Sequence, residues 1–151
     1  MTNSYEAPLT ISAEHLDPSF ARADIEFEGV DHSGASYEGR VFLNNPTADA
    51  KTALTPENGY AGAFHIFGHG GCYGDDETHC EVGHRRSYDP RPSSPLTPAR
   101  KVVIATDAVR RALEKGKKLT VKVVPVVKAT TPKAGAENVL RYEQVSIVTY
   151  H

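Results

Sequence analysis

The chain alternates apolar and polar positions in short runs separated by turn residues, a pattern typical of half-buried strands. In residues 23–30, for example, Ile25 and Phe27 alternate with three carboxylates. Glycine, proline, asparagine and aspartate between the runs indicate turns. We therefore expect six strands, within residues 23–30, 37–45, 59–68, 101–105, 118–127 and 139–150.

One segment has the features of a short helix over residues 107–115. Thr106 is the expected N-cap, because a threonine side chain can accept a hydrogen bond from the first turn. Gly116 is the expected stop, because glycine readily takes the left-handed conformation that ends helices. The apolar residues between them recur at helical spacing and would form one buried stripe of Ala108, Val109, Ala112 and Leu113.

Six short strands, many turns and one helix predict a mainly β fold, an antiparallel β-sandwich or a barrel-like variant. A length of 151 residues suits a single domain, which we place over residues 21–151. Residues 1–20 show no period and are expected to form a flexible N-terminal arm. A loop insertion rich in Gly, His, Cys and Pro is expected over residues 68–98. Pro125 lacks a backbone donor, so its strand should lie at an edge or be bulged there.

Composition and charge exclude only a few classes of function. Apolar residues make up 39% and charged residues 24%, which is ordinary for a globular protein, and the net charge is -2. Basic residues gather in residues 110–133 and acidic ones in residues 1–31, which we interpret as solvated faces. We therefore expect neither nucleic acid nor a membrane as a partner. The first ten residues lack the basic end and apolar core of a secretory signal, so the expected compartment is the cytoplasm.

The unusual chemistry lies in residues 59–84, which hold four of the seven histidines and both cysteines. Imidazole and thiolate are ligands of copper and zinc. On an extended strand His65 and His69 would lie about 13 Å apart, so they can share one ion only if the chain reverses at Gly68. The candidate metal ligands are His65, His69, Cys72, His79, Cys80 and His84.

The state of the two cysteines is open from sequence alone. Their C-x7-C spacing is not that of a zinc finger. A disulfide between Cys72 and Cys80 would close a small acidic loop, whereas thiolates could ligate a metal, and both could also be free. In each case their Cα atoms are expected within about 7 Å, the practical limit for bridging. A histidine-only metal site could coexist with the disulfide, and no catalytic signature identifies a nucleophile.

Three segments resemble a known family. "SYEGRVFLNNP", then "GYAGAFHIFGHGGCYGD" with "HC", and then "YDPRPSSPLTP" are similar to the small β-rich domain that accompanies the copper centre in tyrosinases, polyphenol oxidases and haemocyanins. The similarity runs from about Ile25 to Val127. Within its most distinctive part it includes His65, His69, Cys72, His79 and Cys80.

The resemblance implies an accessory role and not the oxidase itself. The oxidising domain of that family holds two coppers with six histidines on a helical bundle, whereas the one predicted helix of this chain has no histidine. The resemblance therefore implies a β-sandwich that covers, shields or supplies copper to a tyrosinase-family oxidase.

Three functions follow as hypotheses. The first is a copper-binding accessory module whose ligands are His65 and His69, with His79 or His84 as the third and zinc as the alternative metal. The second is a metal-free interaction module tied by a disulfide. The third is a small mononuclear copper oxidase. Whether the chain is an enzyme, and its oligomeric state, are open at this point.

Overall fold

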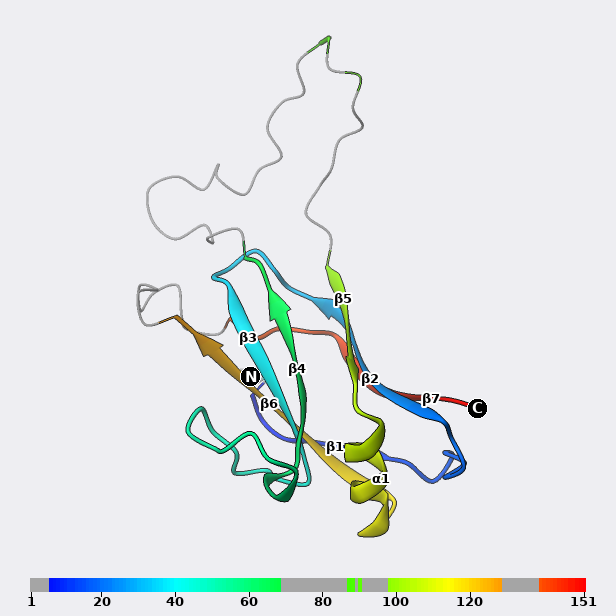
Figure 1. The fold of residues 1–151 in the computed structure, drawn as a ribbon. Coiled ribbons are helices and arrows are strands. Elements are labelled where there is room, and N and C mark those ends of the chain that lie inside the picture. The colour runs from blue at the N-terminus through cyan, green and yellow to red at the C-terminus, as the bar shows by residue number, and fades with distance from the viewer. Residues whose placement is uncertain (1–5, 69–86, 89, 91–97, 129–138) are drawn as a thin grey trace.

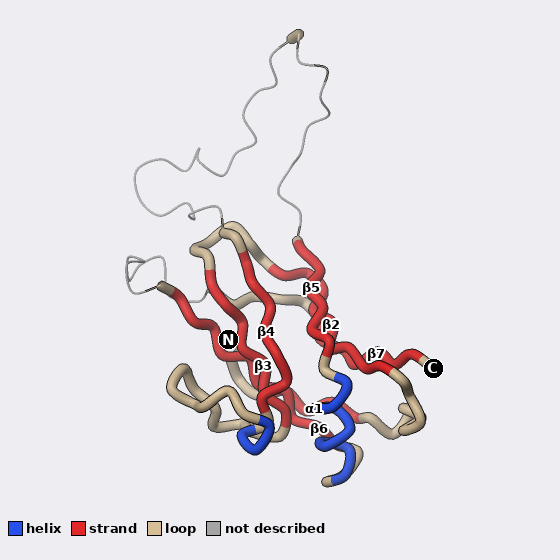
Figure 2. Tube along the Cα trace, in the orientation of Figure 1, coloured by secondary structure: helices blue, strands red, loops and turns tan. Residues whose placement is uncertain are grey.

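The computed structural model describes residues 6–68, 87–88, 90, 98–128 and 139–151. In this part of the chain two antiparallel sheets form a sandwich with one short α-helix (Figures 1 and 2). The first sheet has the order β1-β6-β3-β4 and the second β5-β2-β7. The bounds are β1 Leu9–Ser12, β2 Arg22–Val30, β3 Tyr37–Leu43, η1 Pro56–Asn58, β4 Tyr60–Ile66, β5 Ala99–Ile104, α1 Thr106–Glu114, β6 Lys118–Val127 and β7 Gln144–Tyr150.

The prediction of a mainly β sandwich with one helix is confirmed. Each of the six predicted runs overlaps one of the strands β2 to β7, although β2 begins one residue earlier, at Arg22, and β5 two residues earlier, at Ala99. The last run is only partly a strand, because β7 begins at Gln144. Val139, Leu140 and Tyr142, which precede it, are buried in the core without being part of a sheet. None of the described helices is long and apolar enough to cross a membrane.

The segment expected as an N-terminal arm contributes a strand. β1 pairs with the first half of β6, with Leu9 opposite Val121 and Ser12 opposite Lys118. The residues that follow β1 reach into the core, where Ala13, Leu16 and Phe20 are buried. The strand left no alternating pattern in the sequence because it is four residues long and mostly exposed, and backbone bonds hold it to β6.

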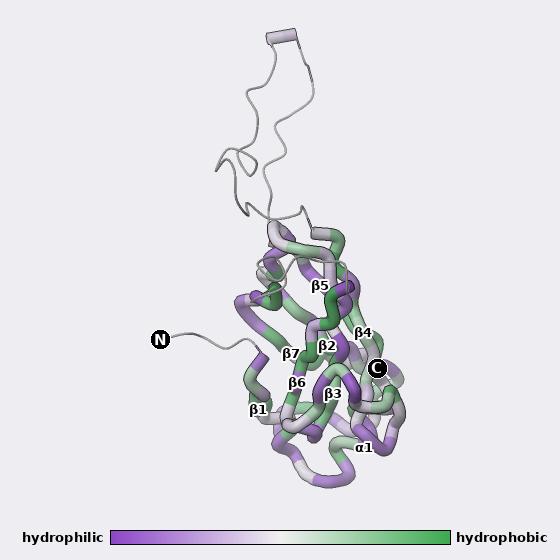
Figure 3. Tube along the Cα trace, turned by 90° about the vertical axis from the view of Figure 1, so that its left-hand side faces the viewer, coloured by the Kyte–Doolittle hydropathy of each residue, from purple (hydrophilic) through white to green (hydrophobic). Residues whose placement is uncertain are grey.

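The core lies between the two sheets. On β2, Ile25 and Phe27 are fully buried, as the alternation predicted. The Phe27 ring contacts Phe64 of β4 at 4.9 Å between centroids and Tyr142 at 5.4 Å, so one aromatic cluster joins both sheets. Figure 3 shows apolar, green positions interspersed with polar, purple ones along the strands. A smaller apolar cluster on the outer face of the first sheet consists of Phe42, Ala48 and Val124.

Helix α1 packs its apolar stripe on the core, but it begins differently from the prediction. Ala108, Val109 and Ala112 are buried. The N-cap is Ala105, without a side-chain cap bond, so the prediction of Thr106 as N-cap is wrong. The Thr106 hydroxyl instead accepts a hydrogen bond from the Ala23 amide of β2 at 3.2 Å, which ties the helix to the second sheet.

The ends of α1 and β6 follow the expected backbone rules. Gly116, just beyond α1, has a positive φ of 140°, and its amide donates to the Leu113 carbonyl at 3.2 Å. In β6, Pro125 lies opposite Gly39 of β3, whereas β1 pairs only with residues 118–121. In the described structure Pro125 therefore lies at a local edge, where its missing donor costs no ladder bond, and that prediction is confirmed.

Candidate functional site

The candidate site begins at the end of β4, where the strand carries His65 to the surface. Phe64 and Ile66 are buried, whereas His65 and Phe67 are exposed, as the two-residue period predicted. Phe67 is 84% exposed. The first predicted metal ligand is therefore held on a paired strand with its side chain accessible to solvent.

The neighbours of His65 on the sheet are already engaged with each other. Glu38 of β3 lies opposite His65 in register. Its carboxylate accepts a hydrogen bond from Arg40 Nε at 3.1 Å, and Arg40 Nη1 also donates to the Ala50 carbonyl at 3.3 Å. This carboxylate is therefore part of an ion pair on the outer face of the sheet.

Beyond β4 the chain is fixed against the turn that precedes β3. The Gly68 amide donates to Ser36 Oγ at 2.9 Å. A Cβ at position 68 would collide with the backbone of Gly34 and Ala35, so this close approach requires glycine. The structure thus brings the exit of β4 against the turn that contains His32, far away in sequence.

That turn is stabilised by Asp31. Its Oδ1 accepts hydrogen bonds from the Ser33 amide at 2.8 Å and from the Ser33 hydroxyl at 2.7 Å. Burial by itself would raise the pKa of Asp31, but the Ser33 hydrogen bonds and the nearby Arg141 charge outweigh it and lower the pKa. Asp31 is therefore a carboxylate that prefers the ionised form.

The other predicted ligands, His69, Cys72, His79, Cys80 and His84, lie outside the described residues. Their convergence with His65 and the distance between the two cysteines therefore remain predictions. Within the described ranges there is no group of three or more His, Cys, Asp or Glu side chains that could hold a metal ion. His65 and its described neighbours do not by themselves fit a copper ion.

The acidic stripe of β2 is also not a metal site, because arginines occupy it. Asp24 is 1% exposed and accepts two hydrogen bonds from Arg22, at 2.7 and 2.8 Å. Arg100 of β5 contacts Glu26 at 2.6 Å and Glu28 at 2.8 Å. The hydrogen bond to Asp24 is the main cause of the raised pKa of Arg22.

Tyr37 is a buried ionisable group that the sequence did not single out. It is 4% exposed, and its hydroxyl has no hydrogen-bond partner within the described structure. Burial is the main cause of its raised pKa, and the charges of Asp31 and Tyr142 add to it. The available signal was the strand period, which places Tyr37 on the same inner face as Val41.

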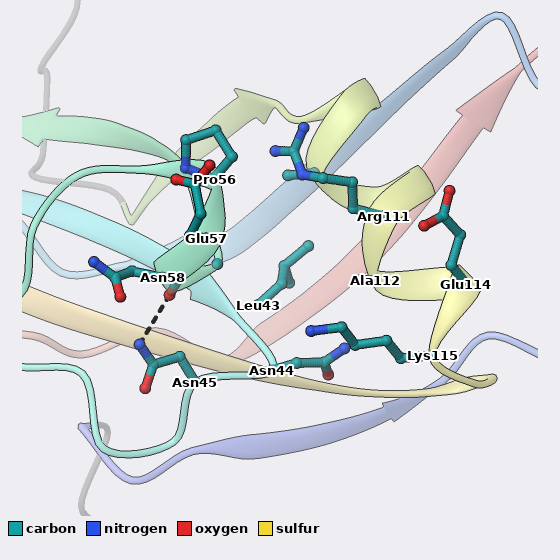
Figure 4. A pocket seen from close by; sticks show the side chains of 12 residues that line it. Leu43, Asn44, Asn45, Pro56, Glu57, Asn58, Arg111, Ala112, Glu114 and Lys115 are labelled. Carbon is teal, nitrogen blue, oxygen red and sulfur yellow. Dashed lines mark hydrogen bonds between the residues drawn. The ribbon is translucent and has the colours of Figure 1, made fainter.

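A cleft of about 330 Å³ lies between η1 and the end of α1 (Figure 4). Among its lining residues, the Asn45 side-chain amide donates to the Asn58 carbonyl at 2.8 Å. The cleft contains no histidine or cysteine, so it is distinct from the predicted metal site. Its charged lining residues are Glu57, Arg111, Glu114 and Lys115.

Comparison with known proteins places the fold. No family model matches the chain, and no curated protein matches it. Among solved structures, latent aurone synthase (polyphenol oxidase) from a natural source matches with a TM-score of 0.54 and 16% identity over 95% of this chain. The recombinantly expressed latent aurone synthase matches with a TM-score of 0.53 and 16% identity, also over 95% of this chain.

In both comparisons the chain spans 24% of the length of the oxidase. At this level of identity the likeness shows the fold alone. The predicted resemblance to a domain of polyphenol oxidases is therefore confirmed at the level of the fold.

Proposed function

We propose that the chain is an accessory β-sandwich module of a polyphenol-oxidase-type enzyme and that it holds or shields a copper ion for that enzyme. The observation that carries the proposal is the fold, which 95% of the chain shares with about a quarter of latent aurone synthase. The match is consistent with the C-terminal β-sandwich domain of that oxidase. The other three-quarters of such an enzyme would then have to supply the oxidising centre.

Among the proposed copper ligands, His65 is the one that lies in the described part of the chain. It is exposed, and pairing with β3 fixes the backbone beneath it. His69, with His79 or His84, would complete the set, while Cys72 and Cys80 would add thiolates or form the disulfide. Imidazoles suit both Cu²⁺ and Zn²⁺, and the general affinity order favours copper. The module would then either shield the bound copper or transfer it to the partner oxidase.

Phe67 supports a protein contact at the same end of β4. It lies two residues beyond His65 on the outward side, and 84% of it is exposed. Aromatic side chains are enriched in protein interfaces relative to the rest of the surface. The proposed partner would therefore contact the module next to the proposed copper ligands.

The proposal is tested by the copper content of this chain, prepared without a tag, after loading with Cu²⁺ and desalting. The double variant His65→Ala with His69→Ala should lose the bound copper and keep its circular dichroism spectrum, because His65 is outside the core. The matched control is His15→Ala with His151→Ala, which removes two exposed histidines outside the loop and should bind like the parent. Unchanged copper content in the first double variant would place the site elsewhere.

The same samples separate the two alternative functions. A parent that binds neither copper nor zinc and has no free thiol would be the disulfide-tied interaction module. A copper-loaded parent that consumes oxygen with a phenol, and stops doing so in the double variant, would be a mononuclear oxidase. Copper binding without oxygen consumption is the result expected for the accessory module.

A further inference from the structure

Strand β7 has one side without a partner strand in the described part of the sandwich. It lies at the end of the order β5-β2-β7, pairs with β2, and runs to the C-terminus (Figure 1). Its sequence, QVSIVTY, contains no charged residue, no glycine and no proline. Such an edge exposes backbone donors and acceptors that readily pair with another strand.

The other three edges carry features that discourage pairing. β5 has two consecutive charges, Arg100 and Lys101, and a register shift against β2. β4 packs against β5. The Val103 side chain of β5 fills the space beside Gly62 of β4, so that a Cβ added at Gly62 would lie 2.6 Å from Val103 Cγ1. β1 is only four residues long. Charges, irregularities, covering and shortness are the usual protections of sheet edges. In the described structure β7 has no charge, no register shift against β2 and no further strand beside it, and it is seven residues long.

We propose that β7 pairs with β7 of a second copy of this chain, which would join two three-stranded sheets into one six-stranded sheet. A twofold axis perpendicular to the sheet relates the copies and makes the pairing antiparallel. The midpoint of β7 is Ile147. Pairing about this residue places Ser146 opposite Val148 and Gln144 opposite Tyr150, so no like charges face each other along the strand.

The polar residues that flank β7 suit the same register. Pairing about Ile147 places the position of Glu143 opposite that of His151, once at each end of the joined strands. Both residues are exposed. An imidazole N–H can donate a hydrogen bond to a carboxylate, whereas like charges opposite each other would destabilise the pair. In this register Glu143 and His151, which flank β7, are each opposite the other residue in the second copy. The proposed partner is therefore a second copy of this chain.

The second sheet offers a matched pair of variants. Ser146 and Glu26 are paired in register, as are Val148 and Asp24, so both β7 side chains are on the outer face. On the far side of β2, Val102 is paired with Glu26 and Ile104 with Asp24. Two lysines on β7 and two on β5 therefore have the same carboxylates beside them, on opposite edges of the sheet.

The test is sedimentation velocity of the full chain from low micromolar to near-millimolar concentration. The parent should dimerise as the concentration rises, and Ser146→Lys with Val148→Lys should weaken dimerisation at least about tenfold, because the lysines of two copies meet at the axis. Val102→Lys with Ile104→Lys should dimerise like the parent. A parent that stays monomeric throughout, or a β5 variant that weakens as much as the β7 variant, would overturn the proposal.

Hydrogen exchange of the parent keeps the proposal testable if the β7 variant does not fold. The amides of β7 should exchange more slowly as the concentration rises, whereas those of the β5 edge should not change. Exchange at β7 that does not depend on concentration would contradict pairing through this edge. Neither measurement depends on copper, so failure here and failure of the proposed function are distinguishable.

Discussion

The buried hydroxyl of Tyr37 leads to a prediction about stability: Tyr37→Phe should stabilise the protein. The hydroxyl has no hydrogen-bond partner in the described structure, and the residue is 4% exposed. The ring contacts Phe64 edge to face, with 6.1 Å between centroids. Phenylalanine keeps this contact and removes only the group that lost its hydrogen bonds to water on folding.

The magnitude follows from two opposing effects. Burial of an unpaired hydroxyl costs about 1–3 kcal/mol in protein mutational data. Removal of one oxygen leaves a gap of roughly 10 Å³, which costs about 0.2 kcal/mol at the usual dependence on cavity volume. The net gain in unfolding free energy should therefore be about 1 kcal/mol. For a chain of 151 residues this raises the Tm by about 2–4 °C.

The pKa of Tyr37 makes the gain depend on pH. Burial, followed by the charges of Asp31 and Tyr142, raises the pKa of Tyr37 in the folded protein. Above pH about 10, the ordinary pKa of tyrosine, the unfolded chain releases this proton while the folded protein keeps it. The stability of the parent therefore falls as the pH rises through this range. Tyr37→Phe lacks this loss, so its advantage should grow above pH about 10.

Urea unfolding followed by circular dichroism, at neutral pH and above pH 10, measures both effects. The control is Tyr150→Phe, because Tyr150 is 45% exposed. The unfolding free energy of this variant should differ from that of the parent by less than about 0.5 kcal/mol. A Tyr37→Phe variant that is less stable than the parent would show that the hydroxyl has a bonding partner. A gain that stays constant with pH would refute the argument from the pKa.

Three further substitutions test the packing and the turn. Gly39→Ala should lower the unfolding free energy by about 1–3 kcal/mol, because the new Cβ would lie 2.5 Å from the buried Phe64 ring. Thermal melts of the variant and the parent measure this loss. Gly59→Ala should also destabilise, because φ is 80° and a Cβ would collide with a β3 carbonyl, and urea midpoints compare it with the parent. Asp31→Asn should cost stability at neutral pH but less at pH about 3, since Ser33 holds the pKa of Asp31 low; unfolding at both pH values checks the sign.

The strands were predictable where one face of the sheet is buried. In β2 the buried Ile25 and Phe27 impose a period of two, and the sequence carries that period. β1 has no such signal, because pairing with β6 is a backbone interaction that does not require apolar side chains. Thr106 illustrates a different limit. Its hydroxyl suits an N-cap, but the fold brings the Ala23 amide to it, 83 residues away in sequence.

The candidate site was predictable only in part, for a related reason. The face of His65 follows from the alternation of β4. The approach of Gly68 to the turn at Ser36 does not, because it depends on contacts between distant segments. The carboxylates of β2 make the same point. Alternation predicts that Asp24 points away from the core, as it does, but not that it is 1% exposed there with its carboxylate satisfied by an ion pair with Arg22.

The sheet order separates the two proposed activities of the sandwich. His65 is on β4, in the first sheet, whereas the proposed dimer forms through β7, at the far end of the second sheet. Between them lies the aromatic cluster of Phe27, Phe64 and Tyr142, which joins the sheets and includes neither surface. Because no described contact links the two surfaces, copper loading should leave dimerisation unchanged. The variant His65→Ala with His69→Ala should likewise dimerise like the parent, and a shift in its sedimentation would show that the two surfaces are coupled through the core.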